Sequence, residues 1–411
     1  MTLSAVDLFS GAGGWSQGWA DATGCQPIVA VNHDAHAVHL HRLNHPATDH
    51  FLEDIWQVDP AKAVAGRLVD WLHMSPSCTH HSRARGGVPK EAQLRSQAWV
   101  GVEWAKVCRP RFLSLENVLE WQDWGPLDAA GHPIASRKGE HFREFVAALR
   151  GLGYSVAWQG LCAADFGAPT IRTRLFLVAR RGGGRIAWPK PTHGKGTGKP
   201  WRGAEDCIDW SLPVPSIFAR RKPLATKTCQ RIAAGIVRHV IDKGGDAFMA
   251  PSSMGGNYGA ELCSAWIAKH YGGVIGNDAR DPLGTITAKD HHALVTVTAV
   301  GKRASECAAF LTSYYSGGGT SSDLRAPMPT VVTRDRHGLV LCRYLGESAA
   351  ICNIGMRMLT PRELARAQGF PDSYQLEGSN AAQIARIGNS VVPQIAAAIV
   401  RANLGREVAV A

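Results

Sequence analysis

Near its start the chain reads Ala5-Val6-Asp7-Leu8-Phe9-Ser10-Gly11-Ala12-Gly13-Gly14. The apolar residues before the glycines predict a short buried strand, and the residues from Trp15 onward predict a helix. Because glycine has no side chain, the turn between strand and helix lets a ligand approach the backbone. The pattern differs from the GxGxxG fingerprint, so the turn indicates a binding edge of an α/β sheet without identifying the ligand.

Short apolar runs alternate with amphipathic stretches through the first half of the chain. Further strands are predicted at residues 28–31, 69–74, 112–115 and 175–179, and a second helix at 35–43. The strands are continuously apolar, which is typical of strands that are covered on both faces. The sequence therefore predicts the α/β class, with a doubly wound, mostly parallel sheet.

The composition changes at Arg180. From there to Gly203 the chain is rich in glycine, proline and lysine, which predicts a basic linker or mobile loop rather than a packed element. Between about residues 205 and 350, turns and short β-type segments predominate.

An internal repeat lies in this second part. Pro282–Val295 recurs as Pro327–Val340. Two good copies are too few for a solenoid, and we favour a duplicated strand–turn–strand element over a repeated binding code. The polar turns of the two copies carry Lys289, Arg334 and Arg336, which we expect to contact a partner.

The overall charge narrows the classes of molecule that the protein is expected to bind. A formal net charge of +11 favours a polyanion such as nucleic acid, with an anionic membrane surface as the weaker alternative. No apolar run approaches the length of a membrane span, and the first residues lack the pattern of a signal peptide. The ten cysteines are scattered without a CxxC pair, which predicts reduced thiols in a cytoplasm.

Cys78 is a candidate nucleophile. It follows the apolar run 68–74 and the turn Ser75-Pro76-Ser77, so a buried strand would deliver its thiol into a sharply turned loop. The basic side chains behind it favour the thiolate, and these are His80, His81, Arg83 and Arg85. Buried inert cysteines are the commoner case, so this neighbourhood alone leaves both interpretations open.

Polar residues also follow two other predicted strands. Asn32-His33-Asp34 ends the second strand, where doubly wound folds hold a ribose, and Glu53-Asp54-Ile55 offers an edge for adenine. The alternative is that Asp34 and Asp54 are ordinary caps or turn residues. His33, His36 and His39 recur at helical spacing without a matched acidic or cysteine partner. We therefore expect a solvated helix face there and no metal.

Further segments form an ordered set with the glycine turn and the Cys78 loop, and these are Glu116-Asn117-Val118, Arg172-Thr173-Arg174, and residues 357–374 and 387–393. Taken in order, all of these segments resemble the DNA (cytosine-5)-methyltransferase family. The glycine turn at 7–14 looks like its S-adenosylmethionine loop, and Pro76-Ser77-Cys78 looks like its nucleophile loop. The remaining matches are Glu116-Asn117-Val118 (the ENV motif), Arg172-Thr173-Arg174 (the paired-arginine motif), and residues 357–374 and 387–393 (the last two motifs).

This resemblance implies a Rossmann-like, S-adenosylmethionine-dependent methyltransferase domain at residues 1–182. It implies a smaller, mostly β or irregular target-recognition domain at 183–370, which includes the basic linker and the repeat. A C-terminal segment at 371–411 would return to the catalytic domain.

The same resemblance implies methylation of cytosine C5 in double-stranded DNA after base flipping. The Cys78 thiolate would attack the neighbouring C6 carbon, which makes C5 nucleophilic. Glu116 would supply a protonated carboxyl near N3. Arg174 would bind the base O2, and Arg172 would support the loop or a phosphate. Asn117 would orient the nucleophile loop.

The family motifs also suggest binding residues. S-adenosyl-L-methionine, which becomes S-adenosyl-L-homocysteine, would contact Phe9, Ser10, Gly11, Ala12, Gly13, Gly14, Asn32, His33, Asp34, Asp54, Ile55, Pro76, Asn389, Ser390 and Val391. DNA would contact Ser82, Arg83, Arg85, Lys289, Arg334 and Arg336. We expect a cytoplasmic, nucleoid-associated monomer, and a separate cognate restriction endonuclease is a candidate partner in a restriction–modification system.

Three positions depart from the family pattern. Ser77 stands where proline usually precedes the catalytic cysteine, Thr170 replaces the usual glutamine before the paired arginines, and Asn32 replaces an acidic residue at the ribose position. Two alternatives therefore stand beside the DNA methyltransferase: a catalytically impaired DNA-binding protein of the same fold, and a transfer-RNA cytosine-5 methyltransferase.

Overall fold

The computed structural model describes residues 2–76, 97–128, 132–243, 246, 248–250, 263–269, 277–283, 285–286, 292–298, 307–313, 321–322, 337–343 and 353–405. The chain forms two compact units. The first comprises Met1–Cys162, Thr173–Lys190 and Ser390–Ala411, and the second comprises Ala163–Arg172 and Pro191–Asn389. Residues 371–389 therefore lie in the second unit, and the functions assigned to the two parts stay a prediction.

A seven-stranded sheet forms the centre of the first unit. Its order is β3-β2-β1-β4-β5-β7-β6, in which the first five strands run parallel and β7 runs antiparallel to both neighbours. The strands are β1 (Ala5–Leu8), β2 (Val29–Asn32), β3 (Asp49–Leu52), β4 (Trp71–Met74), β5 (Phe112–Asn117), β6 (Tyr154–Cys162) and β7 (Thr173–Arg181). The predicted Rossmann-like fold with a mostly parallel sheet is confirmed.

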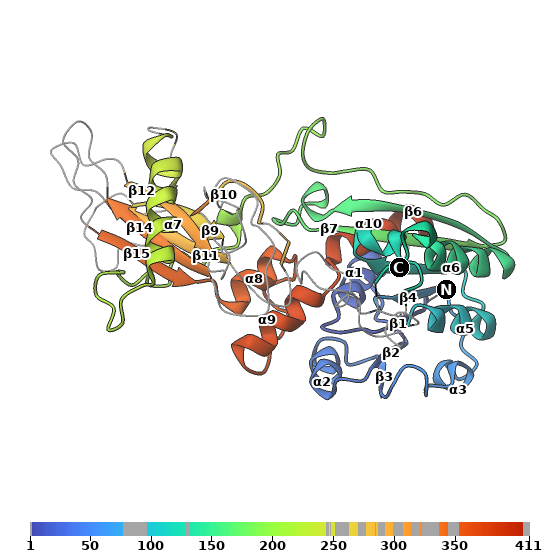
Figure 1. Ribbon diagram of the computed structural model, residues 1–411. Helices are drawn as coiled ribbons and strands as arrows, with labels where there is room; N and C mark the ends of the chain where they lie inside the picture. The colour runs from blue at the N-terminus through green and yellow to red at the C-terminus, as the bar shows by residue number, and fades with distance from the viewer. Residues whose placement is uncertain are drawn as a thin grey trace. The chain divides into compact units, whose positions relative to one another are not determined.

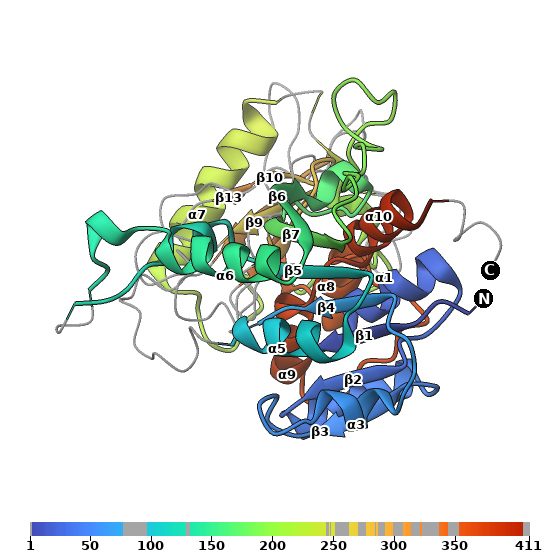
Figure 2. The same cartoon turned by 90° about the vertical axis from the view of Figure 1, so that its right-hand side faces the viewer.

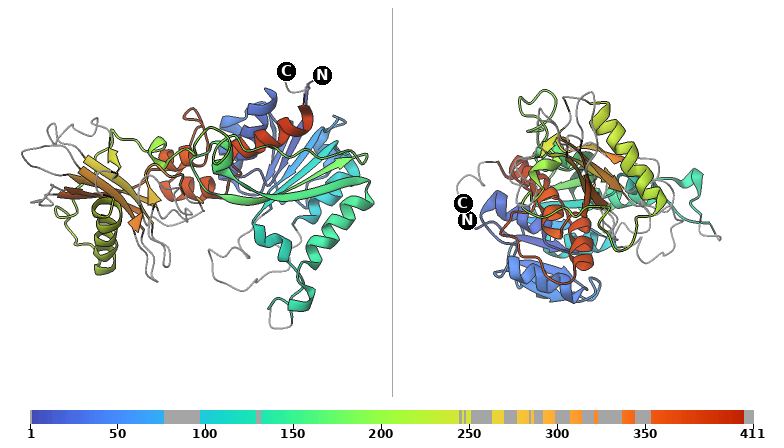
Figure 3. Two further views of the ribbon diagram at one scale, coloured as in Figure 1. Left: turned by 90° about the horizontal axis from the view of Figure 1, so that it is seen from above. Right: turned by 90° about the vertical axis from the view of Figure 1, so that its left-hand side faces the viewer.

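Helices cover both faces of this sheet. Helices α1 and α10 lie on one face, and α5 and α6 lie on the other (Figures 2 and 3). The helices of the unit are α1 (Gly14–Thr23), α2 (Ala35–Asn44), α3 (Pro60–Val64), α5 (Trp99–Cys108), α6 (Glu140–Gly151) and α10 (Pro393–Leu404). Short 3₁₀ turns occur at Leu119–Asp123 and Ala135–Arg137.

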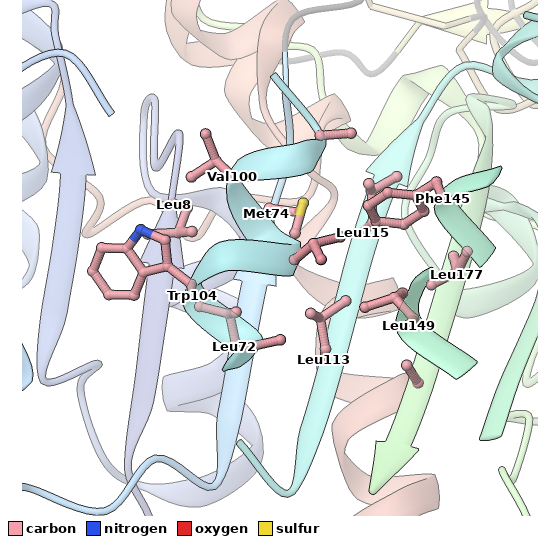
Figure 4. Close-up of a cluster of buried hydrophobic side chains, with 14 of the residues drawn as sticks. Leu8, Leu72, Met74, Val100, Trp104, Leu113, Leu115, Phe145, Leu149 and Leu177 are labelled. Carbon is pink, nitrogen blue, oxygen red and sulfur yellow. The ribbon is translucent and has the colours of Figure 1, made fainter. Parts of the chain in front are cut away.

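The core of the first unit explains why its strands are so apolar. Leu72, Met74 and Leu113 of the central strands are fully buried, and they pack with side chains of α5 and α6 (Figure 4). By contrast, β3 and β6 are the two edges of the sheet, and most of their residues are at least partly exposed. Continuous apolarity therefore predicted the central strands and missed both edges.

A mostly antiparallel sheet, in which only β12 and β9 pair in parallel among the described strands, dominates the second unit. Its strands are β8 (Met249–Ala250), β9 (Cys263–Lys269), β10 (Asn277–Asp278), β11 (His292–Thr298), β12 (Cys307–Ser313), β13 (Ser321–Ser322), β14 (His337–Arg343) and β15 (Asn353–Met358). Helix α7 (Thr226–Ile236), extended by a π-helical turn at Val237–Ile241, lies along one face of this sheet (Figure 1). Helices α8 (Pro361–Ala367) and α9 (Asn380–Asn389) follow β15.

The internal repeat corresponds to strands of this sheet. His292 and His337 occupy equivalent positions in the two copies, and they begin β11 and β14 respectively. The favoured interpretation as a duplicated β element therefore agrees with the strands. The turns that carry Lys289, Arg334 and Arg336 lie outside the described residues.

A buried ion pair fixes the start of α8. Arg357 Nη2 lies 2.6 Å from Glu363 Oε1, and the Glu363 side chain is fully buried. Thr360 forms a capping box with Glu363, and the amide of Asp209 donates to the same carboxylate. Both oxygens of the Glu363 carboxylate thus accept hydrogen bonds. Through this one side chain, the motif at 357–374 connects the end of β15, the start of α8 and the segment at Asp209.

The basic stretch at 180–203 connects the two compact units, as a linker would, because the boundary falls between Lys190 and Pro191. It is nevertheless more packed than the composition predicts. Its first residues extend β7 to Arg181. Farther along, the indole of Trp201 donates to Asp165 Oδ1 at 3.0 Å, and the amides of Thr192 and His193 donate to the Asp165 carbonyl. Composition could not show these bonds, because they join residues that are distant in the sequence.

Candidate active site

The carboxyl ends of β1, β4 and β5 meet at one edge of the first sheet, and hydrogen bonds join the loops that leave them. The amide of Ser75 donates to Leu8 O at 3.3 Å, and its hydroxyl donates to Phe9 O at 3.3 Å. Asn117 Nδ2 donates to Pro76 O at 3.3 Å. The first residues of the predicted nucleophile loop are therefore tied to both neighbouring strands.

Glu116 and Arg174 form a buried ion pair beside these bonds. Arg174 Nε lies 3.4 Å from Glu116 Oε1, and the two side chains are only 15% and 8% exposed. They come from β5 and β7, which pair antiparallel. With so little water around them, the carboxylate and the guanidinium attract each other more strongly than at a surface. The structure thus brings together two residues that, by the family resemblance, would contact the same cytosine base.

Arg172 points to different partners. Its side chain is buried, and Nη1 donates to Ile286 O at 2.6 Å and to Gly388 O at 2.9 Å. All three residues belong to the second unit. These contacts join Arg172 to backbone carbonyls of the second unit, one of them in α9, and both roles predicted for Arg172 stay predictions.

The glycine turn has the geometry expected of a ligand-binding loop. Phe9, Gly11 and Gly13 all have positive φ, at 61°, 53° and 80°. A Cβ at Gly11 would have Phe9 O as its nearest heavy atom, at 3.7 Å, an ordinary van der Waals distance, so the described residues do not crowd this backbone. Ser10 is 7% exposed, and its hydroxyl has no hydrogen-bond partner within the described chain. A polar ligand with a hydrogen-bonding group fits this turn.

The acidic residues of the predicted cofactor edge bond to the protein's own backbone. Asp34 Oδ1 caps α2 by accepting from His36 N at 2.9 Å and Ala37 N at 3.4 Å. Asp54 Oδ1 accepts from Trp56 N at 3.0 Å. In each residue one carboxylate oxygen, Oδ1, therefore acts as a cap or turn acceptor, which agrees with the alternative interpretation. Of the other residues predicted for this edge, Ile55 is buried, Asn32 accepts from the amide of Asp34, and His33 is exposed.

The C-terminal segment packs against the glycine turn. A Cβ on Gly14 would lie 2.1 Å from Val391 O and 3.2 Å from Ser390 Cβ, so only glycine allows this approach. Ser390 and Val391 are buried, and Ala12 of the turn is buried as well. Asn389 ends α9 and is exposed. Two of the three predicted C-terminal cofactor residues are thus next to the turn.

The sequence analysis did not identify a network of buried polar side chains that begins at Asp7, just before the glycine turn. Ser16 Oγ donates to Asp7 Oδ2 at 2.6 Å and lies 2.9 Å from His41 Nε2, and His41 Nδ1 lies 2.8 Å from His50 Nε2. Burial raises the pKa of Asp7 to about 7, and burial lowers the pKa of His41 well below its usual value. An aspartate inside the apolar strand Ala5–Leu8 was the available signal.

The histidines that the sequence did single out, His33, His36 and His39, are exposed. Within the described ranges, no group of three or more histidine, cysteine or acidic side chains is arranged to hold a metal ion. The helices described here include none that is long and apolar enough to cross a membrane. Cys78, Ser82, Arg83 and Arg85 lie outside the described residues, as does Ser77.

Comparison with known proteins assigns the family. The profile described as C-5 cytosine-specific DNA methylase matches residues 3–199 and 298–404, which is more than half of the chain. The chain belongs to the C-5 cytosine-specific DNA methylase family. Its match covers both the glycine turn and the returning C-terminal segment.

Individual relatives of this chain have low sequence identity to it. Type II methyltransferase M1.HphI of Haemophilus parahaemolyticus is 29% identical over 47% of this chain and 50% of that protein. DNA (cytosine-5)-methyltransferase 1B of Oryza sativa is 25% identical over 97% of this chain and 28% of that protein. The chain thus spans about half or less of the length of these two relatives. A mutant of Spodoptera frugiperda DNMT2 shares the fold, with a TM-score of 0.53, 16% identity, and coverage of 97% of this chain and 98% of that one.

Proposed function

We propose that this C-5 cytosine-specific DNA methylase transfers a methyl group from S-adenosyl-L-methionine to C5 of cytosine in double-stranded DNA. The observation that carries the proposal is the buried pair of Glu116 and Arg174. Asn117, the next residue after Glu116, holds the carbonyl of Pro76, two residues before Cys78. In this proposal a carboxyl, a guanidinium and the Cys78 thiol are the groups that activate cytosine.

In this proposal the target base leaves the duplex stack, because C5 and C6 are out of reach inside it. The Cys78 thiolate then forms a bond to C6, and the electron pair of the C5–C6 double bond becomes available at C5. Glu116 places a proton at N3, and Arg174 holds O2, so that negative charge on the ring is neutralised. After C5 has gained the methyl group, a base removes the C5 proton, the Cys78 thiolate is expelled, and N3 returns its proton to Glu116.

The residues around the glycine turn fit the proposed methyl donor. Ser10 offers a buried hydroxyl, and the described residues do not crowd the backbone at Gly11. Ser390 and Val391 border the same turn. S-adenosyl-L-methionine bound there supplies an electrophilic methyl group and leaves as S-adenosyl-L-homocysteine. The remaining family positions, among them Asp34, Asp54 and Asn389, complete this site in our proposal.

DNA contacts are proposed for Ser82, Arg83, Arg85, Lys289, Arg334 and Arg336, by the resemblance of their segments to the family. The type II methyltransferases among the relatives support a restriction–modification setting. We accordingly propose a cytoplasmic, nucleoid-associated monomer with a separate cognate endonuclease.

Bisulfite sequencing tests the function directly. DNA from cells that express the chain should carry 5-methylcytosine at a recurrent sequence, and DNA from cells that express Cys78→Ser should not. The purified protein should also form a covalent complex with duplex DNA that contains 5-fluorocytosine, because fluorine at C5 prevents the final loss of a proton. Methylation that persists with Cys78→Ser would refute the nucleophile, and methylation of transfer RNA alone would refute the substrate.

A further inference from the structure

The turn Gly194–Lys199 is a hydrogen-bonded structure on the surface of the second unit. Gly194 N donates to Lys199 O at 2.7 Å, which closes the turn. The hydroxyl of Thr197 donates to Gly194 O at 2.8 Å and lies 3.0 Å from Lys199 O. One threonine therefore braces both ends of a turn that consists mainly of glycine and lysine.

Packing against Asp165 and Gly167 fixes this turn in place. Thr192 N and Trp201 Nε1, which flank the turn, both donate to Asp165. A Cβ on Gly194 would lie 2.4 Å from Trp201 Nε1, and a Cβ on Gly167 would lie 2.7 Å from His193 Cε1. The turn is thus held to the segment that leads directly into Arg172.

The tip of the turn presents free donors to open space. Gly196 and Gly198 have φ of +83° and +75°, and nothing lies within 4 Å of a Cβ built on either. Among the described residues, the amides of Lys195, Gly196 and Gly198 donate to no protein acceptor. Neighbouring backbone N–H groups beside left-handed residues form concave anion sites in proteins.

Positive charge is concentrated at the same place. Lys195 and Lys199 are exposed, and neither forms an ion pair within the described part of the chain. The pKa of His193 is lowered, first by burial and then by repulsion from Lys199 and Arg202. Arg202 itself is paired with Asp206. The two lysines therefore remain available for a ligand, and their field already acts on a neighbouring side chain.

We propose that the turn Gly194–Lys199 binds one backbone phosphate of the DNA substrate, through Lys195, Lys199 and the free amides of the tip. A phosphate has several acceptor oxygens and accepts from lysine and backbone N–H groups together. The open space around Gly196 and Gly198 admits a polymer rather than enclosing a small molecule. This site rests on the proposed function and adds an element that positions DNA without reading its sequence.

Salt dependence of DNA binding is the first test. Binding of unmodified duplex DNA would be measured at several salt concentrations for the wild type, for Lys195→Ala/Lys199→Ala, and for Lys62→Ala, whose exposed lysine lies on α3. Loss of one phosphate contact should lower the slope of log K against log salt by about one. We expect roughly tenfold weaker binding for the double variant, equally for all DNA sequences. Lys62→Ala should match the wild type.

Replacing single phosphates of the DNA by uncharged groups would show which phosphate the turn contacts. In a series of duplexes, each with one methylphosphonate, one position should weaken binding by the wild type and have no effect on the double variant. Thr197→Val, which keeps both lysines and loses the brace, should weaken binding less than the double variant. Binding of labelled S-adenosyl-L-methionine should be unchanged in every variant, which shows that the proteins are folded.

The outcomes separate the two proposals. If wild-type protein binds and methylates DNA and the double variant has the same affinity and salt slope, the phosphate site is wrong and the function stands. If the double variant loses affinity for transfer RNA and not for DNA, the proposed ligand is wrong. If the wild type neither binds nor methylates DNA, the proposed function fails and the phosphate site fails with it.

Discussion

The Arg174 guanidinium lies 3.4 Å from the Glu116 carboxylate, and neither side chain is more than 15% exposed. The two residues are far apart in the sequence, and they meet because β7 runs antiparallel beside β5. Two properties of the pair can therefore be measured separately. One is the coupling energy of the two charges in the folded protein, and the other is the contact with one base in the proposed reaction.

Replacing Glu116 by glutamine should abolish the proposed proton transfer and keep the shape of the side chain. We expect methyl transfer to fall by about 100- to 10,000-fold, the range for loss of a general acid or base. DNA and cofactor affinities should change little. Steady-state methylation assays would measure the effect, with Glu103→Gln on the exposed face of α5 as the control. Nearly unchanged turnover would remove Glu116 from the mechanism.

The stability of the pair can be measured with a double-mutant cycle. Arg174→Ala leaves Glu116 as a buried charge without its guanidinium, so this single variant should be markedly less stable than the wild type. Adding Glu116→Gln should restore part of the loss, with a coupling of about 0.5–3 kcal/mol. Urea unfolding of the four proteins gives this value. Additive effects would show that the two side chains do not interact in solution.

Asn117 should act on the nucleophile loop. Asn117→Asp keeps an acceptor for the amide of Val118 but cannot donate to Pro76 O. We expect kcat to fall about tenfold or more from the lost bond, with the cofactor Kd unchanged. The rate of covalent capture by 5-fluorocytosine DNA would fall in parallel. If kcat falls but capture does not slow, the tether does not position Cys78.

Substitutions at Gly14 and Gly151 form a matched pair that tests how closely Ser390 and Val391 pack against the glycine turn. Gly14→Ala places a Cβ 2.1 Å from Val391 O, whereas nothing lies within 4 Å of a Cβ on Gly151. The first variant should lose about 1–3 kcal/mol through overpacking, and it should bind the cofactor more weakly. Gly151→Ala, at the end of α6, should be neutral or slightly stabilising. Equal stabilities would contradict the close packing of Ser390 and Val391.

Asp7 should make stability depend on pH. Its pKa is raised from 3.8 to about 7, so between these values the native state binds a proton that the unfolded state releases. Stability should therefore fall as pH rises from about 4 to 7, and the cost, on the order of a few kcal/mol, is complete above pH 7. Asp7→Asn still accepts from Ser16 and removes this dependence. The difference in unfolding free energy between the two proteins should favour the variant increasingly up to pH 7 and then stay constant.

The sequence was most informative where a residue's role depends on its immediate neighbours. The central strands, the glycine turn at 7–14 and the strands of the repeat could all be predicted, because periodicity and turn residues are local properties. The edge strands β3 and β6 were missed, since one exposed face lets polar residues interrupt the pattern. The basic stretch before Gly203 does join the two units, but its packing was missed, because Asp165 and Trp201 meet only in the folded chain.

The sequence by itself determined the fold class, the order of the motifs and the types of residue in the candidate site. Only the tertiary structure decided that Glu116 contacts Arg174, while Arg172 binds the carbonyls of Ile286 and Gly388. Two arginines separated by one residue look alike in a sequence. Their side chains have different partners because the chain passes from one compact unit to the other between them, and strand pairing fixes where each one points.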